Sequence, residues 1–298
     1  MTSQTLYIIG NGFDLHHGLP TEYWRFKNYL EQVDREVCDW VESYIAIDDD
    51  WAELELSLAD LDTEGIVTEL EGFLVPYSAE DWSDAGHHDF QYEVEKVATG
   101  LSAGLHQHFA NWIRSIPMPD RDQVPLLLTS LDKDAAYLTF NYTSTLTKLY
   151  DIAPENILHI HGEGEDESSD LVLGHARAVA DRSSLQDGVD ENTDTRFAEA
   201  MGILDDYFEK TFKPSAKIIE QQKPYFEGLK SITQVVVLGH SLSKVDEAYF
   251  LTLVEALQAR PRWTVAVRSL DENPSKAACL IDFGVPSESI DFKLWSQL

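Results

Sequence analysis

Short apolar segments that end directly in glycine or polar residues constrain the fold of this 298-residue chain more than any other feature. The first of them, residues 5–9 (TLYII), runs into Gly10-Asn11-Gly12, a pattern typical of a buried strand followed by a tight turn. Further segments of strand length follow at residues 135–140, 157–160, 171–173, 235–238 and 264–267. The sequence therefore predicts a sheet whose strands are spread over the whole chain.

Helical segments separate the predicted strands. Apolar residues recur at helical spacing over residues 21–47, 51–74, 89–113 and 245–257. Because strands and helices alternate, we predict an α/β fold with a Rossmann-like, mostly parallel sheet covered by helices on both faces. We expect one such domain over residues 1–298, with a helical insertion at 21–120 and a second helical piece at 195–229. Ligands bind such sheets at the carboxyl ends of the strands, which is where the candidate site residues lie.

The charge and the cysteine content exclude several classes of protein. Twenty-two Lys and Arg against 53 Asp and Glu give a net charge of −31, which repels polyanions, so nucleic acid is not an expected partner. No apolar run approaches the roughly 18 residues of a membrane span, and no signal peptide pattern opens the chain, so no membrane partner is expected. Only Cys38 and Cys279 occur, which argues against a disulfide framework and a zinc ribbon and favours a cytoplasmic location.

Two glycine turns that follow predicted strands are candidate binding sites for a ligand that carries phosphate. Glycines let backbone N–H groups approach a phosphate closely, and a following helix N-terminus adds partial positive charge. The same glycines also fit an ordinary strand-to-helix turn, and the first turn lacks the three-glycine dinucleotide fingerprint. The candidate binding residues are Gly10, Asn11, Gly12, Phe13, Gly239, His240 and Ser241.

Polar residues that can carry chemistry follow two other predicted strands. Asn141 comes directly after residues 135–140, and its amide offers a donor and an acceptor to a water or a ribose hydroxyl, although such an Asn also closes ordinary turns. His159 and His161 occupy alternate positions of the next strand, which places them on one face, where they can share a metal or act as one base and one support. His175 follows the segment 171–173 and repeats this pattern more weakly.

These stretches, taken in order, resemble the bacteriophage abortive infection AbiH family. The resemblance rests on Gly-Asn-Gly-Phe-Asp at residues 10–14, Gly-Leu-Pro-Thr at 18–21, Phe-Asn-Tyr-Thr at 140–143 and His-Ile-His-Gly at 159–162. A more distant resemblance links the same stretches and Gly239 to Leu242 with the sirtuin NAD-binding fold, whose corresponding turns line the NAD site. It implies a sirtuin-like fold that takes NAD as substrate or ligand.

The sirtuin resemblance also implies roles for individual residues. Asn141 corresponds to the asparagine that positions the nicotinamide ribose, and His161 to the general base. Ser241 lies in the turn that approaches the phosphates, and Asp14 replaces a serine that lies near the ribose or the nicotinamide.

Three departures from the sirtuin pattern limit what carries over. Thr143 replaces the aspartate that helps to hold nicotinamide, and His240 replaces a threonine. The four zinc cysteines are absent, so we expect no zinc and no protein deacylation.

The candidate function is antiphage abortive infection by hydrolysis of NAD at the nicotinamide–ribose bond, with Asn141, His161 and Asp14 as catalytic residues. One alternative is a metal-dependent nuclease or phosphohydrolase whose ligands come from His159, His161, Asp14 and His240. The other is a non-catalytic module that senses a nucleotide. The expected partner is a nucleotide or dinucleotide, and a second copy of the chain and a phage trigger are further candidates.

Overall fold

The computed structural model of the chain describes residues 3–77, 86–124, 126–129 and 131–298. The chain forms two compact units. Unit 1 contains residues 1–22, 113–172 and 214–298, and unit 2 contains residues 23–112 and 173–213. The sheet lies in unit 1, and unit 2 is helical.

Unit 1 is built on a six-stranded, all-parallel sheet in the order β3-β2-β1-β4-β5-β6. Its strands are β1 (Thr5–Ile9), β2 (Ala136–Thr139), β3 (Ile157–His159), β4 (Gln234–Leu238), β5 (Arg262–Val267) and β6 (Ile290–Leu294). The predicted α/β fold with a Rossmann-like parallel sheet is therefore confirmed. The strand order reverses between β1 and β4, and open α/β sheets bind their ligands at such a switch point.

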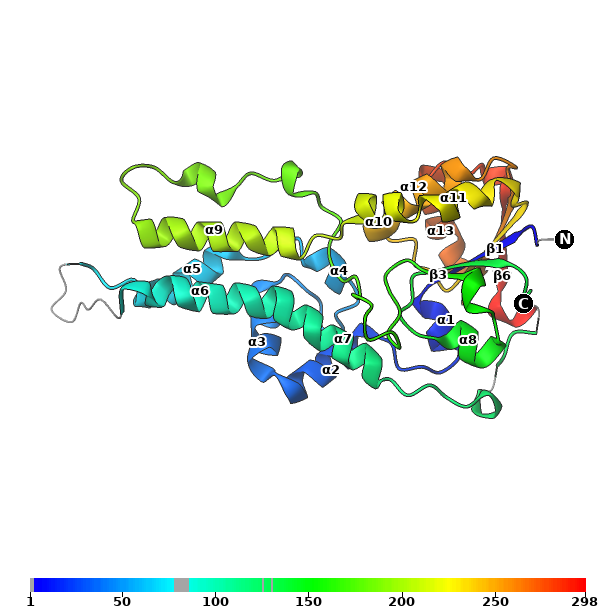
Figure 1. Cartoon of the computed structure of the whole chain (residues 1–298), viewed down its shortest axis with the longest axis horizontal. Helices are drawn as coiled ribbons and strands as arrows, with labels where there is room; N and C mark the ends of the chain where they lie inside the picture. The colour runs from blue at the N-terminus through cyan, green and yellow to red at the C-terminus, as the bar shows by residue number, and fades with distance from the viewer. Residues whose placement is uncertain (1–2, 78–85, 125, 130) are drawn as a thin grey trace. The chain divides into compact units, whose positions relative to one another are not determined.

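Helices pack on both faces of this sheet (Figure 1). One face carries α1 (Asn11–His16) and α8 (Thr145–Tyr150), and the other carries α10 (Ser215–Gln221), α11 (Lys223–Gly228), α12 (Glu247–Ala256) and α13 (Asn273–Asp282). Strand side chains alternate between the two cores because successive residues point to opposite faces. Along β1, Leu6 and Ile8 belong to the core beneath α10–α13, whereas Tyr7 and Ile9 belong to the core beneath α1 and α8.

Short 3-10 turns connect the elements of unit 1. They are η4 (Arg121–Gln123), η5 (Pro154–Asn156), η8 (Leu229–Ser231), η9 (Lys244–Asp246), η10 (Leu270–Glu272), η11 (Ser287–Ser289) and η12 (Trp295–Gln297).

Unit 2 is formed by helices that pack around buried aromatic side chains. Its core includes Phe26, which meets Trp51 edge-on at a centroid distance of 6.0 Å and Phe109 at 5.4 Å. The helices are α2 (Tyr23–Val33), α3 (Arg35–Tyr44), α4 (Leu54–Ser57), α5 (Thr63–Leu70), α6 (Asp89–Thr99), the π-helical η3 (Gly100–Gly104), α7 (Leu105–Ser115, whose end belongs to unit 1) and α9 (Thr195–Lys210), with the 3-10 turns η1 (Glu71–Phe73), η2 (Gly86–His88), η6 (Val179–Asp181) and η7 (Leu185–Gly188). Among the helices that the structure describes, none has the length and apolar sequence needed to cross a bilayer.

Both helical segments predicted apart from the sheet contribute to unit 2. Residues 23–112 of the predicted insertion lie there, together with α9 from the predicted second piece. The rest of that second piece, α10 and α11, packs against the sheet in unit 1.

Acidic caps divide two helices that the sequence predicts as continuous. The predicted helix 21–47 is two helices, because the Asp34 side chain accepts a hydrogen bond from the Val37 N–H (3.2 Å) and starts α3 there. The predicted helix 51–74 is divided in the same way, since Asp62 accepts from the Gly65 N–H (2.8 Å) and starts α5.

Two predictions about strands are wrong. Residues 171–173 form no strand: the Val172 N–H donates to the His161 carbonyl (2.8 Å), but the segment remains a loop. Conversely, β6 was not predicted, because its sequence Ile-Asp-Phe-Lys-Leu alternates between apolar and charged residues and contains no apolar run.

The turns that follow β1 and β4 touch through their backbones. The Gly10 N–H donates to the Leu238 carbonyl (3.0 Å), and the Gly12 N–H donates to the Gly239 carbonyl (2.8 Å). Gly239 has a φ of +74°, and a Cβ atom there would lie 2.1 Å from the backbone nitrogen of Phe13. The contact therefore requires glycine at this position.

We predict that Gly239→Ala lowers the free energy of unfolding by about 3 kcal/mol or more, because the left-handed backbone and the clash with Phe13 both penalise a side chain. Gly284 is the matched control, since its φ is +97° but the nearest atom to an added Cβ, on Val254, is 3.6 Å away. Gly284→Ala should therefore cost only about 1 to 2 kcal/mol. Denaturant unfolding of both variants measures the difference, and equal losses would contradict this account of the contact.

Candidate functional site

Polar side chains gather at the carboxyl ends of β1, β2 and β4 and in the turn after β3, around the switch point of unit 1. They form two clusters. The Asp14 cluster consists of Asp14, Asn141, Thr143 and Thr145, and the Asp246 cluster consists of His161, His240 and Asp246. The sequence predicted Asp14, Asn141, His161 and His240 as site residues, and the fold brings all four to this edge of the sheet.

Asp14 is a buried carboxylate held by two hydroxyl groups. It lies on α1 with 1% of its surface exposed. The Thr143 hydroxyl donates to Oδ2 (2.6 Å) and the Thr145 hydroxyl donates to Oδ1 (2.7 Å). Burial raises the pKa of Asp14 to about 6, and the hydrogen bonds from Thr143, Thr145 and Asn141 limit that rise. The carboxyl group therefore titrates near physiological pH, as groups at functional sites often do.

Asn141 follows the end of β2 and hydrogen-bonds the turn after β1. Its Nδ2 donates to the Gly10 carbonyl (3.1 Å), and its backbone N–H donates to the Thr139 hydroxyl (3.1 Å). The side chain also hydrogen-bonds Asp14, which makes it part of the same cluster. Since only 6% of Asn141 is exposed, these contacts fix the orientation of its amide.

Asp246 lies between two imidazole rings at the start of α12. Its Oδ1 is 3.6 Å from His161 Nε2, and its Oδ2 is 3.4 Å from His240 Nε2. His240 Nδ1 accepts the Leu242 N–H (2.9 Å), so in neutral His240 the proton is on Nε2, facing Asp246. The carboxylate likewise favours the Nε2–H tautomer of His161.

Aromatic rings enclose the Asp246 cluster. Phe140 meets the His240 ring edge-on at a centroid distance of 4.3 Å and the His161 ring at 5.3 Å. Tyr249 lies 5.4 Å from the His161 ring. Because His161 and His240 are only 2% and 3% exposed, their interactions with Asp246 are strengthened by the low dielectric of the surroundings.

A lysine from α13 supports the turn that carries His240. Lys276 Nζ donates to the His240 carbonyl (2.7 Å), and burial lowers the pKa of Lys276. The turn itself is unusual, because Leu242 has a φ of +65°, a left-handed conformation that leucine rarely adopts. Such backbone strain persists where surrounding contacts enforce it, as the contacts of His240 do here.

His159 does not share a face with His161, contrary to the expectation from strand geometry, because β3 ends at His159 and the chain turns before His161. His159 Nδ1 donates to the Asn141 carbonyl (3.2 Å), and its Nε2 is 3.8 Å from Glu163 Oε1. Burial lowers the pKa of His159, whereas Glu163 and the Asn141 carbonyl oppose that effect. His159 therefore holds the backbone of Asn141 through this hydrogen bond.

The alternative metal site gains no geometric support. His159, His161, Asp14 and His240 do not converge on one point, and no group of three or more His, Cys, Asp or Glu side chains in the described part of the chain could hold a metal ion. His175 belongs to unit 2, where its backbone exchanges hydrogen bonds with Thr211 and Lys213.

Several backbone N–H groups of the predicted phosphate-binding turns already donate hydrogen bonds within or between these turns. The N–H groups of Gly10 and Gly12 donate across to the β4 turn, and the Phe13 N–H donates to the Gly10 carbonyl (2.8 Å). Asn11 and Ser241 are exposed beside them. Binding of a ligand by these turns stays a prediction, and the close approach of the two backbones is by itself a reason for their glycines.

A family model described as bacteriophage abortive infection AbiH matches residues 6–267, a range that contains both clusters. The chain belongs to the AbiH family. This membership confirms the resemblance seen in the sequence and supports a role in bacteriophage abortive infection. No match to the chain was found among curated proteins or among solved structures.

Three members of the site in this AbiH protein were missed from its sequence. Asp246 and Lys276 lie in helices, and Thr145 follows the Phe-Asn-Tyr-Thr stretch by two residues. The one signal for Asp246 is its position at the start of a helix directly after the β4 turn, where a side chain faces the carboxyl edge of the sheet.

We predict that Asp14→Asn removes a pH-dependent loss of stability. The folded-state pKa of Asp14, about 6, is above the ordinary aspartate pKa of 3.8, so the folded state holds this proton more tightly than the unfolded state. The contribution of Asp14 to stability therefore falls as pH rises from 4 to 7, by about 3 kcal/mol in total.

Denaturant unfolding of the wild type and of Asp14→Asn across this pH range measures the effect. The difference between the two should grow in favour of the variant and level off above pH 7. Asp50→Asn, at an exposed position, should follow the wild type at every pH. A constant difference between Asp14→Asn and the wild type would contradict the raised pKa.

Proposed function

We propose that this AbiH protein acts in phage defence by hydrolysing NAD at the bond between nicotinamide and ribose. The observation that carries the proposal is the convergence of a rigid asparagine, a buried carboxylate and a carboxylate-held histidine at the switch point of a Rossmann-type sheet. Dinucleotides bind such sheets across this crevice. Consumption of the host's NAD would then end the growth of the phage.

The chemistry of NAD suits a site of this composition. Nicotinamide carries a positive charge on its ring nitrogen in NAD and leaves as a neutral molecule, so no acid has to protonate the leaving group. The site has to stabilise the positive charge that develops on the ribose and to direct a water molecule to C1′. The C1′–N bond breaks with its electron pair going to nicotinamide, and the water becomes the new hydroxyl of ADP-ribose.

Each cluster contributes one part of this reaction. The Asp14 carboxylate, fully buried and ionised above its pKa of about 6, favours positive charge nearby because little water screens it. Asn141, held by Gly10, orients the water or the ribose hydroxyls. His161 takes the proton of the attacking water, and Asp246 stabilises the resulting imidazolium through Nε2.

The first test is release of nicotinamide from NAD by the purified full-length protein, followed by chromatography. Asn141→Ala and His161→Ala should each lower the rate by about 10² to 10⁴-fold, the usual contribution of positioned acid–base groups. His88→Ala, an exposed histidine of η2, should leave the rate unchanged.

Binding measurements separate this proposal from its alternatives. Titration with ADP-ribose should show one site per chain in the wild type and in His161→Ala. Binding without release of nicotinamide under any condition would favour the nucleotide-sensing module. Absence of both binding and release, or a stoichiometric metal in the purified protein, would contradict NAD hydrolysis.

A second prediction concerns Asp246 as the residue that positions His161. Asp246→Asn keeps the shape of the side chain but removes its charge, so the Nε2–H tautomer of His161 is no longer favoured and the rate should fall about 10 to 100-fold. Affinity for ADP-ribose should change less than the rate.

The position of the proton on His161 gives a readout besides activity. Nitrogen chemical shifts of the two imidazole nitrogens should show the Nε2–H form in the wild type and a mixture of tautomers in Asp246→Asn. Asp282→Asn, on the exposed surface of α13, serves as the matched control and should leave both readouts as they are. An unchanged tautomer together with a lower rate would refute the positioning role.

A further inference from the structure

In one half of the sheet in unit 1, one face carries polar residues as well as apolar ones. In β5, Arg262 and Thr264 alternate with Trp263 and Val265, and only the second pair belongs to the core beneath α10–α13. The charged residues of β6 alternate with apolar ones in the same way. Central strands of a parallel sheet are usually apolar on both faces, whereas Arg262, Asp291 and Lys293 are exposed, so this part of the face is open to solvent.

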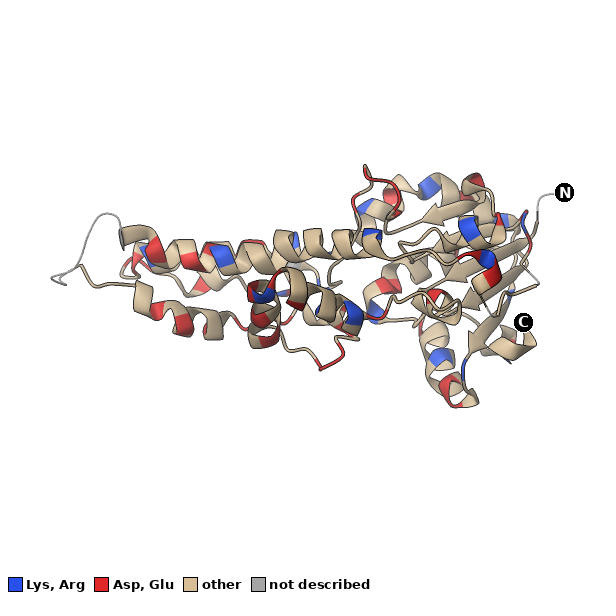
Figure 2. Cartoon of the chain, turned by 90° about the horizontal axis from the view of Figure 1, so that it is seen from below, with Lys and Arg blue, Asp and Glu red and all other residues tan. Residues whose placement is uncertain are grey.

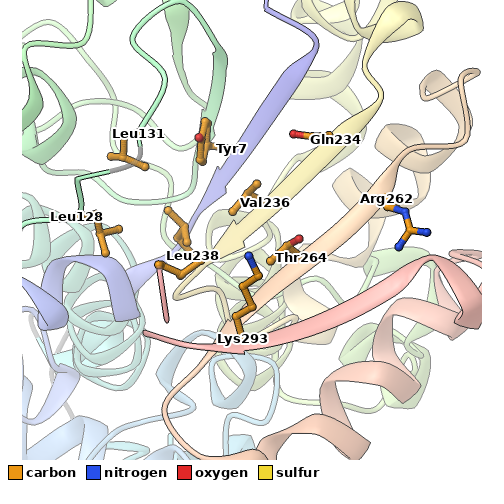
Figure 3. A pocket seen from close by; sticks show the side chains of 10 residues that line it. Tyr7, Leu128, Leu131, Gln234, Val236, Leu238, Arg262, Thr264 and Lys293 are labelled. Atoms are coloured by element: carbon orange, nitrogen blue, oxygen red, sulfur yellow. The ribbon is translucent and has the colours of Figure 1, made fainter. Parts of the chain in front are cut away.

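A cavity of about 250 Å³ lies against this face, over β1, β4, β5 and β6 (Figure 3). One side of the cavity is apolar and is formed by Leu128, Leu131, Val236 and Leu238. The rest of its lining includes Tyr7 and Leu298 together with the Thr264 hydroxyl and the amide of Gln234. All of these residues belong to unit 1.

Lys293 is one of the two cationic residues that line this cavity. Figure 3 shows its ammonium group extending from β6 across the sheet toward Leu238 and Thr264. The other cation of the lining, Arg262, is engaged in an ion pair with Asp291 (3.2 Å). Lys293 is an exposed residue, and its charge stands beside an apolar wall in a chain with 53 acidic and 22 basic residues, whose Lys and Arg are scattered among Asp and Glu in Figure 2.

The size of the cavity limits what it can hold. An engineered apolar cavity of about 150 Å³ binds benzene, so a cavity of about 250 Å³ accommodates one ring with a short substituent. It is too small for a dinucleotide, since sites for drug-sized ligands span roughly 300 to 1,000 Å³. The cavity also lies on the face of the sheet, whereas the Asp14 and Asp246 clusters lie at the carboxyl edge.

We propose that this cavity binds a small organic carboxylate with an apolar body of about one ring. The carboxylate pairs with Lys293 and is within reach of the Thr264 hydroxyl, and the apolar body packs on Val236 and Leu238. A charge-assisted hydrogen bond beside an apolar wall favours such a ligand over a neutral one of the same shape. The inference is independent of the proposed hydrolysis of NAD, because it uses none of the residues of either cluster.

The test uses two fluorescent probes that differ only in charge, 2-aminobenzoate and 2-aminobenzamide, titrated against the full-length protein. The wild type should bind one 2-aminobenzoate per chain, more tightly than the amide. Lys293→Gln should weaken the binding of 2-aminobenzoate about tenfold and leave that of the amide unchanged. Lys230→Gln, at an exposed lysine outside the cavity, should change neither affinity.

A second variant tests the apolar wall. Val236→Phe extends into the cavity and should weaken both probes about tenfold, with a circular dichroism spectrum like that of the wild type. His161→Ala should bind both probes like the wild type. The proposal is overturned by failure of 2-aminobenzoate to saturate, by an equal loss of both probes in Lys293→Gln, or by a dimer of the wild type that Lys293→Gln dissociates, since the face would then be covered by a second copy.

Discussion

The backbone contact between the turns after β1 and β4 is the constraint on which the rest of unit 1 depends. The Gly12 N–H and the Gly239 carbonyl are 2.8 Å apart, and no side chain fits between the two turns. This contact sets the position of the Gly10 carbonyl, which receives Asn141, and places His240 beside its partners at the carboxyl edge. A side chain at either turn would separate β1 from β4 at the switch point and move both clusters apart.

Two buried carboxylates give the site its character, and the protein stabilises them in different ways. Asp14 is surrounded by hydroxyl and amide donors, which satisfy its oxygens without cancelling its charge. Asp246 lies between two imidazole rings, with its carboxylate oxygens 3.6 Å from His161 Nε2 and 3.4 Å from His240 Nε2. Burying a charge is costly unless it is paired or hydrogen-bonded, which is why each of these carboxylates has polar partners around it.

The accuracy of the predicted elements follows from how each element is buried. The strands β1, β2, β4 and β5 were predicted because each contains consecutive apolar residues, which stand out in the sequence as a run. The alternating strand β6 produces no such run. Residues 171–173 are apolar but form a loop, because burial of a segment does not by itself supply a neighbouring strand with which it can pair. Helix ends were misjudged where a cap such as Asp34 interrupts a continuous apolar pattern.

The sequence by itself determined the parallel α/β sheet, the AbiH membership and the positions of Asn141, His161 and Asp14 in the segments that follow strands, because each depends on neighbouring residues. Only the tertiary structure decided that Asp246 joins two histidines, that His159 turns away from His161, and that a cavity with Lys293 lies on the sheet. These are contacts between segments distant in the chain, and the strand order and the close approach of two backbones bring those segments together.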